Sequence, residues 1–211
     1  MLTLKLFIIL SPLVTFSKAI RIYPATREGL IWYNSSDPNS YAGYVSEIDD
    51  LLNQQNRIMN WSPCMSSSSY SFSSTNTGPC IFFSFPEKLK ETPESYNSTT
   101  LPANAPDYLH SYIIGLEADR VRKTHNLAYI TCNGTSPADE ENIGPLHFLR
   151  NLEISILPYS ALTTFTEDVI AVYFEKPMRY IVINVTCKIW ANFKTLEDFE
   201  ASVVTFDLLI D

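Results

Sequence analysis

The segment 180–190 constrains the fold of this chain most, because apolar side chains occupy every second position along it. Its odd positions hold only Ile, Val and Cys, whereas polar residues such as Asn, Thr and Lys occur at even positions. Such alternation places one set of side chains on the buried face of a β-strand and the other set on the opposite face. Cys187 is therefore expected to point into a core. Cys132 ends another stretch of β-forming residues and is also expected in a strand.

The first residues of the chain predict that the rest of it lies outside the cytoplasm. A lysine precedes the apolar run 6–16, and the small residues around Ala19 suit cleavage by a signal peptidase. The run contains Pro12 and is shorter than the roughly 20 residues that a membrane-spanning helix needs. Residues 1–19 are therefore expected to be a signal peptide or a short signal anchor. If residues 1–19 are removed by cleavage after Ala19, the protein is expected to be secreted. If they are retained, it is expected to stay at the plasma membrane with its C-terminal part outside the cell.

Asn-x-Ser/Thr triplets, the acceptors of N-linked glycans, agree with an extracellular location. The predicted acceptors are Asn34, Asn60, Asn97, Asn133 and Asn184. Asn184 falls on the polar face of the alternating strand, and Asn133 falls in an expected turn. The sequence therefore predicts a glycoprotein.

The four cysteines are Cys64, Cys80, Cys132 and Cys187. In an oxidising compartment they most simply form two disulfides, with three possible pairings, whereas inside a cell they would be free core residues. In the chain-entropy model a bridge between the first two contributes about 3 kcal/mol, and a bridge between the last two about 4 kcal/mol. The expected leader favours the oxidised form.

Composition and motifs argue against an enzyme and against a nucleic-acid-binding protein. The net charge is −8, and the basic residues do not form the cluster that phosphate binding requires. His110, His125 and His147 lack the spacing of metal ligands, and the chain has neither a Gly-x-Ser-x-Gly elbow nor a phosphate-binding glycine loop. We therefore expect no catalytic residue, no metal, no cofactor and no small-molecule substrate.

After the leader, residues 20–36 are expected to form a short stalk. An amphipathic helix follows. Asp37 suits its N-cap, Pro38 suits its first position, and apolar residues recur with helical spacing up to about Ile58. An apolar stripe of this kind most often packs against its own domain rather than against a partner.

The remainder of the chain is predicted to be β-rich and to complete one domain, 37–211. The Ser-rich tract between the first two cysteines is expected to be a solvent loop, and residues 87–108 an irregular surface crossing. One early helix followed by short strands predicts a mostly β fold, in which antiparallel sheets pack as a sandwich without a second helical layer. The predicted strands include 81–85, 111–116, 128–132, 180–190 and 203–210.

Sequence motifs spread over most of the chain fall in a recognisable order. They are DPxSYxxYVxxIxxLL at 37–52, Cys64 followed by GPCI at 78–81, CxG at 132–134, LPY at 157–159 and CK at 187–188. This order resembles the beta subunit of sodium/potassium- and proton/potassium-transporting ATPases. The resemblance implies an Ig-like antiparallel sandwich outside the membrane, with disulfides Cys64–Cys80 and Cys132–Cys187.

The resemblance also implies a function. In this family the beta subunit has no active site. It binds the catalytic alpha subunit of a P-type cation pump, helps that subunit fold and reach the cell surface, and modulates its cation affinity. The alternative is a secreted Ig-like binding glycoprotein that no longer associates with an ATPase.

The sequence departs from the family pattern in three ways. Family members carry a cytoplasmic tail and a full single-pass helix, whereas only a short apolar run precedes residue 20 here. The third disulfide of the family has no counterpart. The aromatic-Pro-Tyr patch that touches the alpha subunit in the family corresponds here to the sequence ILPY, so Pro158 and Tyr159 are the expected partner contacts.

Overall fold

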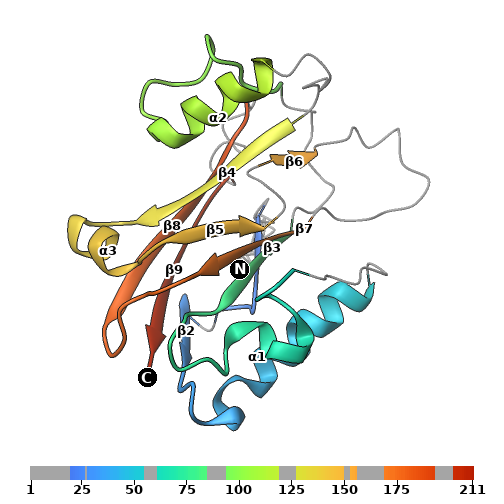
Figure 1. Cartoon of the computed structure of the whole chain (residues 1–211), viewed down its shortest axis with the longest axis vertical. Coiled ribbons are helices and arrows are strands. Elements are labelled where there is room, and N and C mark those ends of the chain that lie inside the picture. Colours follow the sequence, from blue (N-terminus) through green and yellow to red (C-terminus); the bar gives the residue numbers. More distant parts are fainter. Residues whose placement is uncertain are drawn as a thin grey trace, which may run out of the picture.

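Two β-sheets pack against each other and enclose the main hydrophobic core (Figure 1). The mostly β sandwich predicted from the sequence is therefore confirmed. The computed structural model describes residues 20–26, 28–54, 61–84, 94–118, 127–149, 153–155, 169–192 and 202–211.

The four-stranded sheet is antiparallel throughout, with the strand order β1–β3–β7–β5. The central strands β3 and β7 are buried along their whole length, which explains why their sequences are continuous apolar runs. The strands are β1 (Arg21–Tyr23), β3 (Cys80–Ser84), β7 (Val169–Phe174) and β5 (Leu146–Leu149).

The five-stranded sheet has the order β2–β9–β8–β4–β6 and is mixed. Strand β2 pairs with β9 in parallel, so the prediction of wholly antiparallel sheets is wrong at this edge. Parallel neighbours need a long crossover, and here most of the domain separates the two strands in sequence. The strands are β2 (Leu30–Tyr33), β9 (Val203–Ile210), β8 (Val182–Trp190), β4 (Leu127–Gly134) and β6 (Glu153–Ser155).

The alternation predicted for β8 is present in the structure. Ile183, Val185 and Cys187 are buried in the core, whereas Val182 and Asn184 are exposed on the opposite side. We call that opposite side of the five-stranded sheet the outer face.

The stretch expected to be a stalk supplies strands to both sheets. Strand β1 pairs with β3, and β2 pairs with β9, so residues 21–23 and 30–33 belong to the sandwich. Ile31 and Tyr33 are fully buried. Strands of three and four residues are too short to show a clear period, and their pairing partners lie far along the chain. The stalk prediction is therefore wrong for these residues.

Helix α1 (Pro38–Gln54) begins where the sequence predicts. Its apolar stripe, including Ile48, Leu51 and Leu52, joins the main core, and the helix contacts β1 and β2. The predicted end near Ile58 lies outside the described residues. This helix packs against its own domain, as its amphipathic pattern indicates.

The Ser-rich tract between Cys64 and Cys80 is not a simple solvent loop. Residues Ser66–Ser71 form the 3-10 helix η1, and Tyr70 and Phe72 are buried in the main core. Ser71 is buried with the two aromatic side chains that flank it, whereas the other serines of the segment are exposed or half-buried, so the aromatic side chains anchor it. A composition dominated by Ser concealed these anchors.

Two further helices correct the prediction of a single helix. Helix α2 (Asp107–Ala118) replaces the strand predicted at 111–116 and begins inside the predicted irregular crossing. Leu109, Ile113 and Leu116 form its buried stripe at helical spacing, and they pack on Tyr129 and Trp190 of the outer face. The short helix α3 (Pro137–Asn142) follows β4. No helix among the described residues has both the length and the apolar character needed to cross a bilayer.

Candidate functional site

Two disulfides brace the sandwich at separate places. Cys132 and Cys187 face each other in register on β4 and β8, with 4.0 Å between their Cα atoms. Cys64 and Cys80 join the serine-rich segment to the start of β3, with 5.6 Å between their Cα atoms. All four cysteines are buried and paired. These are the pairs that the family resemblance implies.

Two predicted glycan acceptors lie near each other at the β4–β8 pair. Asn133 lies on β4, so the turn predicted there is wrong, because β4 continues to Gly134 in its pairing with β8, and Asn184 is exposed on β8 as predicted. The Thr135 N–H donates to the Asn184 carbonyl oxygen at 2.9 Å, and the hydroxyl oxygens of Thr135 and Thr186 are 3.0 Å apart. The threonines of the two acceptor triplets thus touch each other, because strand pairing joins segments that are distant in sequence.

Helix α3 is fixed beside these acceptors by its N-cap. The Asp139 N–H donates to Ser136 Oγ at 3.2 Å, and the Ser136 N–H donates to the Asp139 carboxylate at 3.0 Å. The same carboxylate accepts from the Asn184 N–H at 2.9 Å. The bond from the Ser136 hydroxyl, followed by the bond from the Asn184 amide, holds the pKa of Asp139 below its usual value. The ionised carboxylate therefore ties α3 to strand β8.

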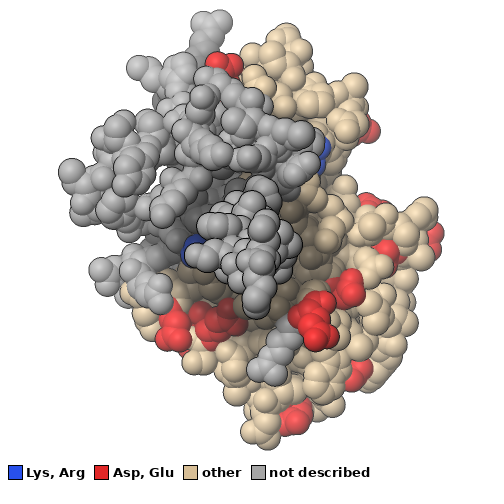
Figure 2. All heavy atoms as spheres, turned by 180° about the vertical axis from the view of Figure 1, so that it is seen from behind, with Lys and Arg blue, Asp and Glu red and all other residues tan. Residues whose placement is uncertain are grey.

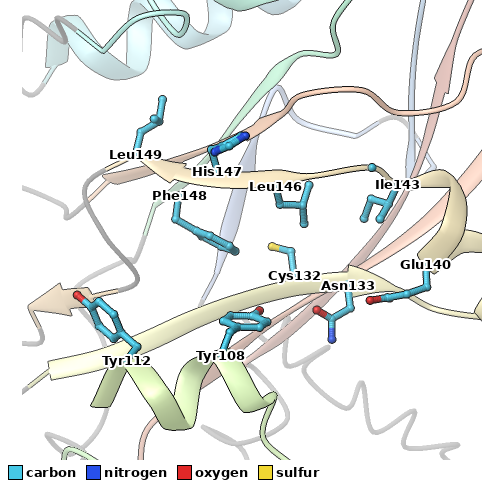
Figure 3. Close-up of a pocket in the computed structure, with 11 residues that line it drawn as sticks. Tyr108, Tyr112, Cys132, Asn133, Glu140, Ile143, Leu146, His147, Phe148 and Leu149 are labelled. Atoms are coloured by element: carbon cyan, nitrogen blue, oxygen red, sulfur yellow. The ribbon is translucent and has the colours of Figure 1, made fainter. Parts of the chain in front are cut away.

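A groove of about 590 Å³ opens between α2, α3, β4 and β5 (Figure 3). Strand β6 pairs only with residues 127–129 of β4. In the described part of the chain no strand pairs with 131–134 on this side, and α3 covers this edge only at Gly134. Strand β5, across the groove, pairs with β7 in the other sheet. The groove follows this open edge.

Aromatic and apolar side chains form the walls of the groove, and Asn133 lies within it. Figure 3 shows Tyr108 and Tyr112 of α2 on one side and Phe148 of β5 on the other, with Asn133 between Tyr108 and Glu140. The groove has an apolar lining and a few convergent polar groups, which is the usual composition of a binding site.

The polar groups of the groove have defined roles. Burial raises the pKa of Tyr108 to about 12, and the phenol, which makes a hydrogen bond with Thr131, is protonated at neutral pH, as an unperturbed phenol also is. The Glu140 carboxylate accepts from the Gly134 N–H at 2.9 Å, which satisfies one amide of β4. At the far wall, His147 Nε2 lies 2.8 Å from the Glu175 carboxylate.

The outer face also carries an apolar row at the end distant from α2. Trp32 of β2 and Val182 of β8 are both opposite Leu209 of β9 in the strand register. The exposed fractions are 43% for Trp32, 51% for Val182 and 75% for the nearby Tyr180. Asn184 follows Val182 by two residues and shares its face. This row therefore exposes three large hydrophobic side chains at one end of the sheet.

Of the remaining predicted site residues, Asn34 and Asn97 lie in the described part of the chain. Asn97 is exposed, and its side-chain oxygen accepts from the Thr99 and Thr100 amides in a turn. Asn34 is half-buried just after β2, and its side-chain oxygen accepts from the next-but-one amide. Asn60, Pro158 and Tyr159 lie outside the described residues.

The described part of the chain shows neither a basic surface patch nor a metal site. On the face shown in Figure 2, acidic side chains are scattered over the surface that is coloured, with few basic ones among them. The described residues contain no group of His, Cys, Asp and Glu arranged to hold a metal ion.

Sequence reasoning did not anticipate the groove, because two of its walls come from α2 and from the edge of the four-stranded sheet. A signal was present in the repeat of Leu109, Tyr112, Ile113 and Leu116, which has helical spacing. The β-branched pair within that segment suggested a strand instead.

This sequence is similar to known proteins over most of its length. The family model for the sodium/potassium ATPase beta chain matches residues 55–204. A relative from Drosophila melanogaster, the sodium/potassium-transporting ATPase subunit beta-2, is 32% identical over 216 aligned residues, which cover 86% of this chain and 66% of the relative. This chain therefore spans just under two thirds of that relative's length. These matches confirm the resemblance drawn from the motifs, and the chain belongs to the sodium/potassium ATPase beta-chain family.

Proposed function

We propose that this chain is the non-catalytic beta subunit of a P-type sodium/potassium-transporting ATPase. It binds the catalytic alpha subunit, assists the folding and plasma-membrane delivery of that subunit, and modulates its cation transport. The observation that carries this proposal is the family match, because residues 55–204 include η1, the strands β3 to β8 and the start of β9.

The proposal includes an extracellular, glycosylated domain. Two buried disulfides are typical of chains that fold in an oxidising compartment. Asn97 and Asn184 are exposed, which suits acceptors of bulky, solvated sugars. Glycans are proposed at Asn34, Asn60, Asn97, Asn133 and Asn184.

The partner contact proposed from the family pattern is the pair Pro158 and Tyr159. In the sequence this pair lies between β6 and β7, the strands at one edge of the five-stranded sheet and in the middle of the other sheet. A proline next to an aromatic ring is suited to a contact, since both lose little conformational entropy on binding.

Co-purification of the alpha subunit tests the proposal. The full-length chain, tagged at its C-terminus, is expressed in animal cells together with a sodium/potassium ATPase alpha chain, and the alpha chain that remains bound after detergent extraction is quantified. We expect the wild type to retain it. The double variant Pro158→Ala/Tyr159→Ala should retain about tenfold less, the loss that corresponds to about 1.4 kcal/mol of binding free energy.

The control is Tyr180→Ala, which removes the most exposed large hydrophobic side chain of the described residues outside the proposed contact. It should retain the alpha chain as well as the wild type does. A wild-type chain that is folded, oxidised and glycosylated but retains no alpha chain would refute the proposal. That result would favour the secreted binding glycoprotein.

A further inference from the structure

We propose that the glycan on Asn133 folds back into the groove between α2, α3, β4 and β5, where its first N-acetylglucosamine packs on Tyr108 and covers the open edge of β4. This inference rests on the glycosylation of Asn133 proposed above. It goes further by assigning an occupant to the groove and a structural role to one particular sugar.

The position of the acceptor carries the first step of the argument. Asn133 is itself a lining residue of the groove, and its side chain lies between Tyr108 and Glu140 (Figure 3). In glycosylation the Asn133 amide nitrogen bonds to the anomeric carbon of a lipid-diphosphate-linked oligosaccharide. The nitrogen loses one proton, and the lipid diphosphate leaves with the electron pair of the broken C–O bond. The first sugar is therefore attached to a residue that is already inside the groove.

The walls of the groove suit an N-acetylated sugar. Aromatic rings bind the apolar C–H face of a pyranose, and apolar side chains accept the acetyl methyl group. Tyr108 and Tyr112 present rings from α2, and Phe148 presents a ring from β5. The volume of about 590 Å³ lies within the range of sites that hold small ligands.

The polar groups suit the hydroxyl and amide groups of the same sugar. The Tyr108 phenol, which already makes a hydrogen bond with Thr131, can donate its proton to a sugar oxygen, and the Glu140 carboxylate can accept from a sugar hydroxyl or amide. Glu140 is held in place because it already accepts from the Gly134 N–H. A donor and an acceptor therefore flank the point of attachment.

The open edge of β4 gives the sugar a function. An uncovered strand edge presents N–H and C=O groups with which another chain can pair. No described strand pairs with this side of 131–134, and α3 covers only Gly134, whose N–H donates to Glu140. The groove therefore borders the edge of β4 at Cys132 and Asn133. A sugar held there blocks pairing by a second strand and buries the aromatic walls.

Asn184 provides the matched comparison. It also lies in an acceptor triplet of the same sheet, but it is exposed and is not among the residues that line the groove. Its Nδ2 donates to the exposed Asp207 carboxylate of β9 and to no residue of the groove, and an exposed hydrogen bond of this kind contributes little. Removal of a glycan there should therefore leave the melting temperature nearly unchanged.

The experiment uses the full-length chain from animal cells as wild type, Asn133→Gln, Asn184→Gln, Tyr108→Ala and the double variant Asn133→Gln/Tyr108→Ala. Glycopeptide mass spectrometry measures the occupancy of each acceptor, and circular dichroism measures thermal unfolding. We expect Asn133→Gln to lower the melting temperature by roughly 3 °C, a shift typical of one lost contact in a domain of this size. Asn184→Gln should change it by less than about 1 °C.

The double variant and a direct contact measurement decide whether the sugar is docked. Tyr108→Ala should cost less in the Asn133→Gln background than in the glycosylated protein, because the shared contact is already absent. In the unmutated protein, nuclear Overhauser effects should link the Tyr108 ring to the first N-acetylglucosamine. This measurement stands even if Tyr108→Ala does not fold.

The possible results distinguish a failure of the docked-sugar inference from a failure of the proposed glycosylation or of alpha-subunit binding. If Asn133 carries no glycan, the inference falls together with that glycosylation site, while alpha-subunit binding is tested independently. If Asn133 is occupied but the two variants are additive and no Overhauser effect is seen, the docked sugar is refuted and the glycosylation stands.

Discussion

Arg179 is predicted to be the most sensitive basic residue of the described structure, because it joins three distant segments. Its Nη1 donates to Ser35 Oγ at 2.9 Å and to the Asp211 carbonyl oxygen at 3.3 Å. Its Nη2 donates to the carbonyl oxygens of Ser74 and Thr77 at 2.8 and 3.1 Å. One guanidinium therefore connects the turn after β2, the serine-rich segment and the end of β9.

The perturbation is Arg179→Met, which keeps an apolar stem and removes all four of these hydrogen bonds. A hydrogen bond to a charged group contributes about 1.5–3 kcal/mol. Arg179 is half-buried, so we count only its two shorter bonds at the low end of that range, which gives about 3 kcal/mol. Since about 1 kcal/mol shifts the melting temperature of a domain of this size by roughly 2–4 °C, we expect a decrease of roughly 6–12 °C.

Thermal unfolding of the oxidised protein, followed by circular dichroism, measures this decrease. Limited proteolysis should also cut residues 73–77 faster in the variant, because the anchor of that segment is lost. Lys176→Met is the matched control. The Lys176 side chain is 71% exposed and lies 4.0 Å from a single carboxylate, so its loss should cost no more than about 0.5 kcal/mol. If Arg179→Met melts within about 2 °C of this control, the reasoning is wrong.

Three further predictions test single features of the fold. Gly134→Ala should destabilise the protein by more than roughly 2 kcal/mol in urea unfolding, because its new Cβ would collide with the backbone of α3, whereas Gly43→Ala has open space and should be neutral or stabilising. Tyr33→Phe should raise the urea midpoint or leave it unchanged, because the fully buried hydroxyl has no hydrogen-bond partner among the described residues; a loss above about 1 kcal/mol would contradict this. The pKa of Asp139 is lowered in the folded state, so its contribution is present above the unfolded-state value near 4 and is lost as the pH falls through the folded-state value. Asp139→Asn should therefore flatten the acid limb of a plot of melting temperature against pH, and an unchanged limb would refute the role of this carboxylate.

Local patterns in the sequence predicted the elements that carry their own signal. Helix α1 has an N-cap, a proline at its first position and an apolar stripe, and it begins at Pro38 as expected. Strand β8 has the predicted faces, and its burial alternates as far as Trp190, which packs against α2. Both elements are long enough for the period of their side chains to be read directly.

Elements whose conformation depends on distant partners were predicted less well. Strands β1 and β2 are too short for a period, and only their neighbours β3 and β9 make them strands. Helix α2 contains β-branched residues that suggested a strand, yet its stripe packs on Tyr129 and Trp190. Contacts with the outer face outweigh the weak local preference.

The sequence by itself determined the compartment expected for this protein, its acceptor triplets, its cysteines and its family, because each of these is written in a short stretch of residues. Only the tertiary structure decided that the Asn133 and Asn184 triplets touch, that Arg179 joins three segments, and that a groove follows the open edge of β4. These features arise from pairing between residues far apart in the chain. Such pairing is selected by the burial of whole sheet faces, which no local pattern records.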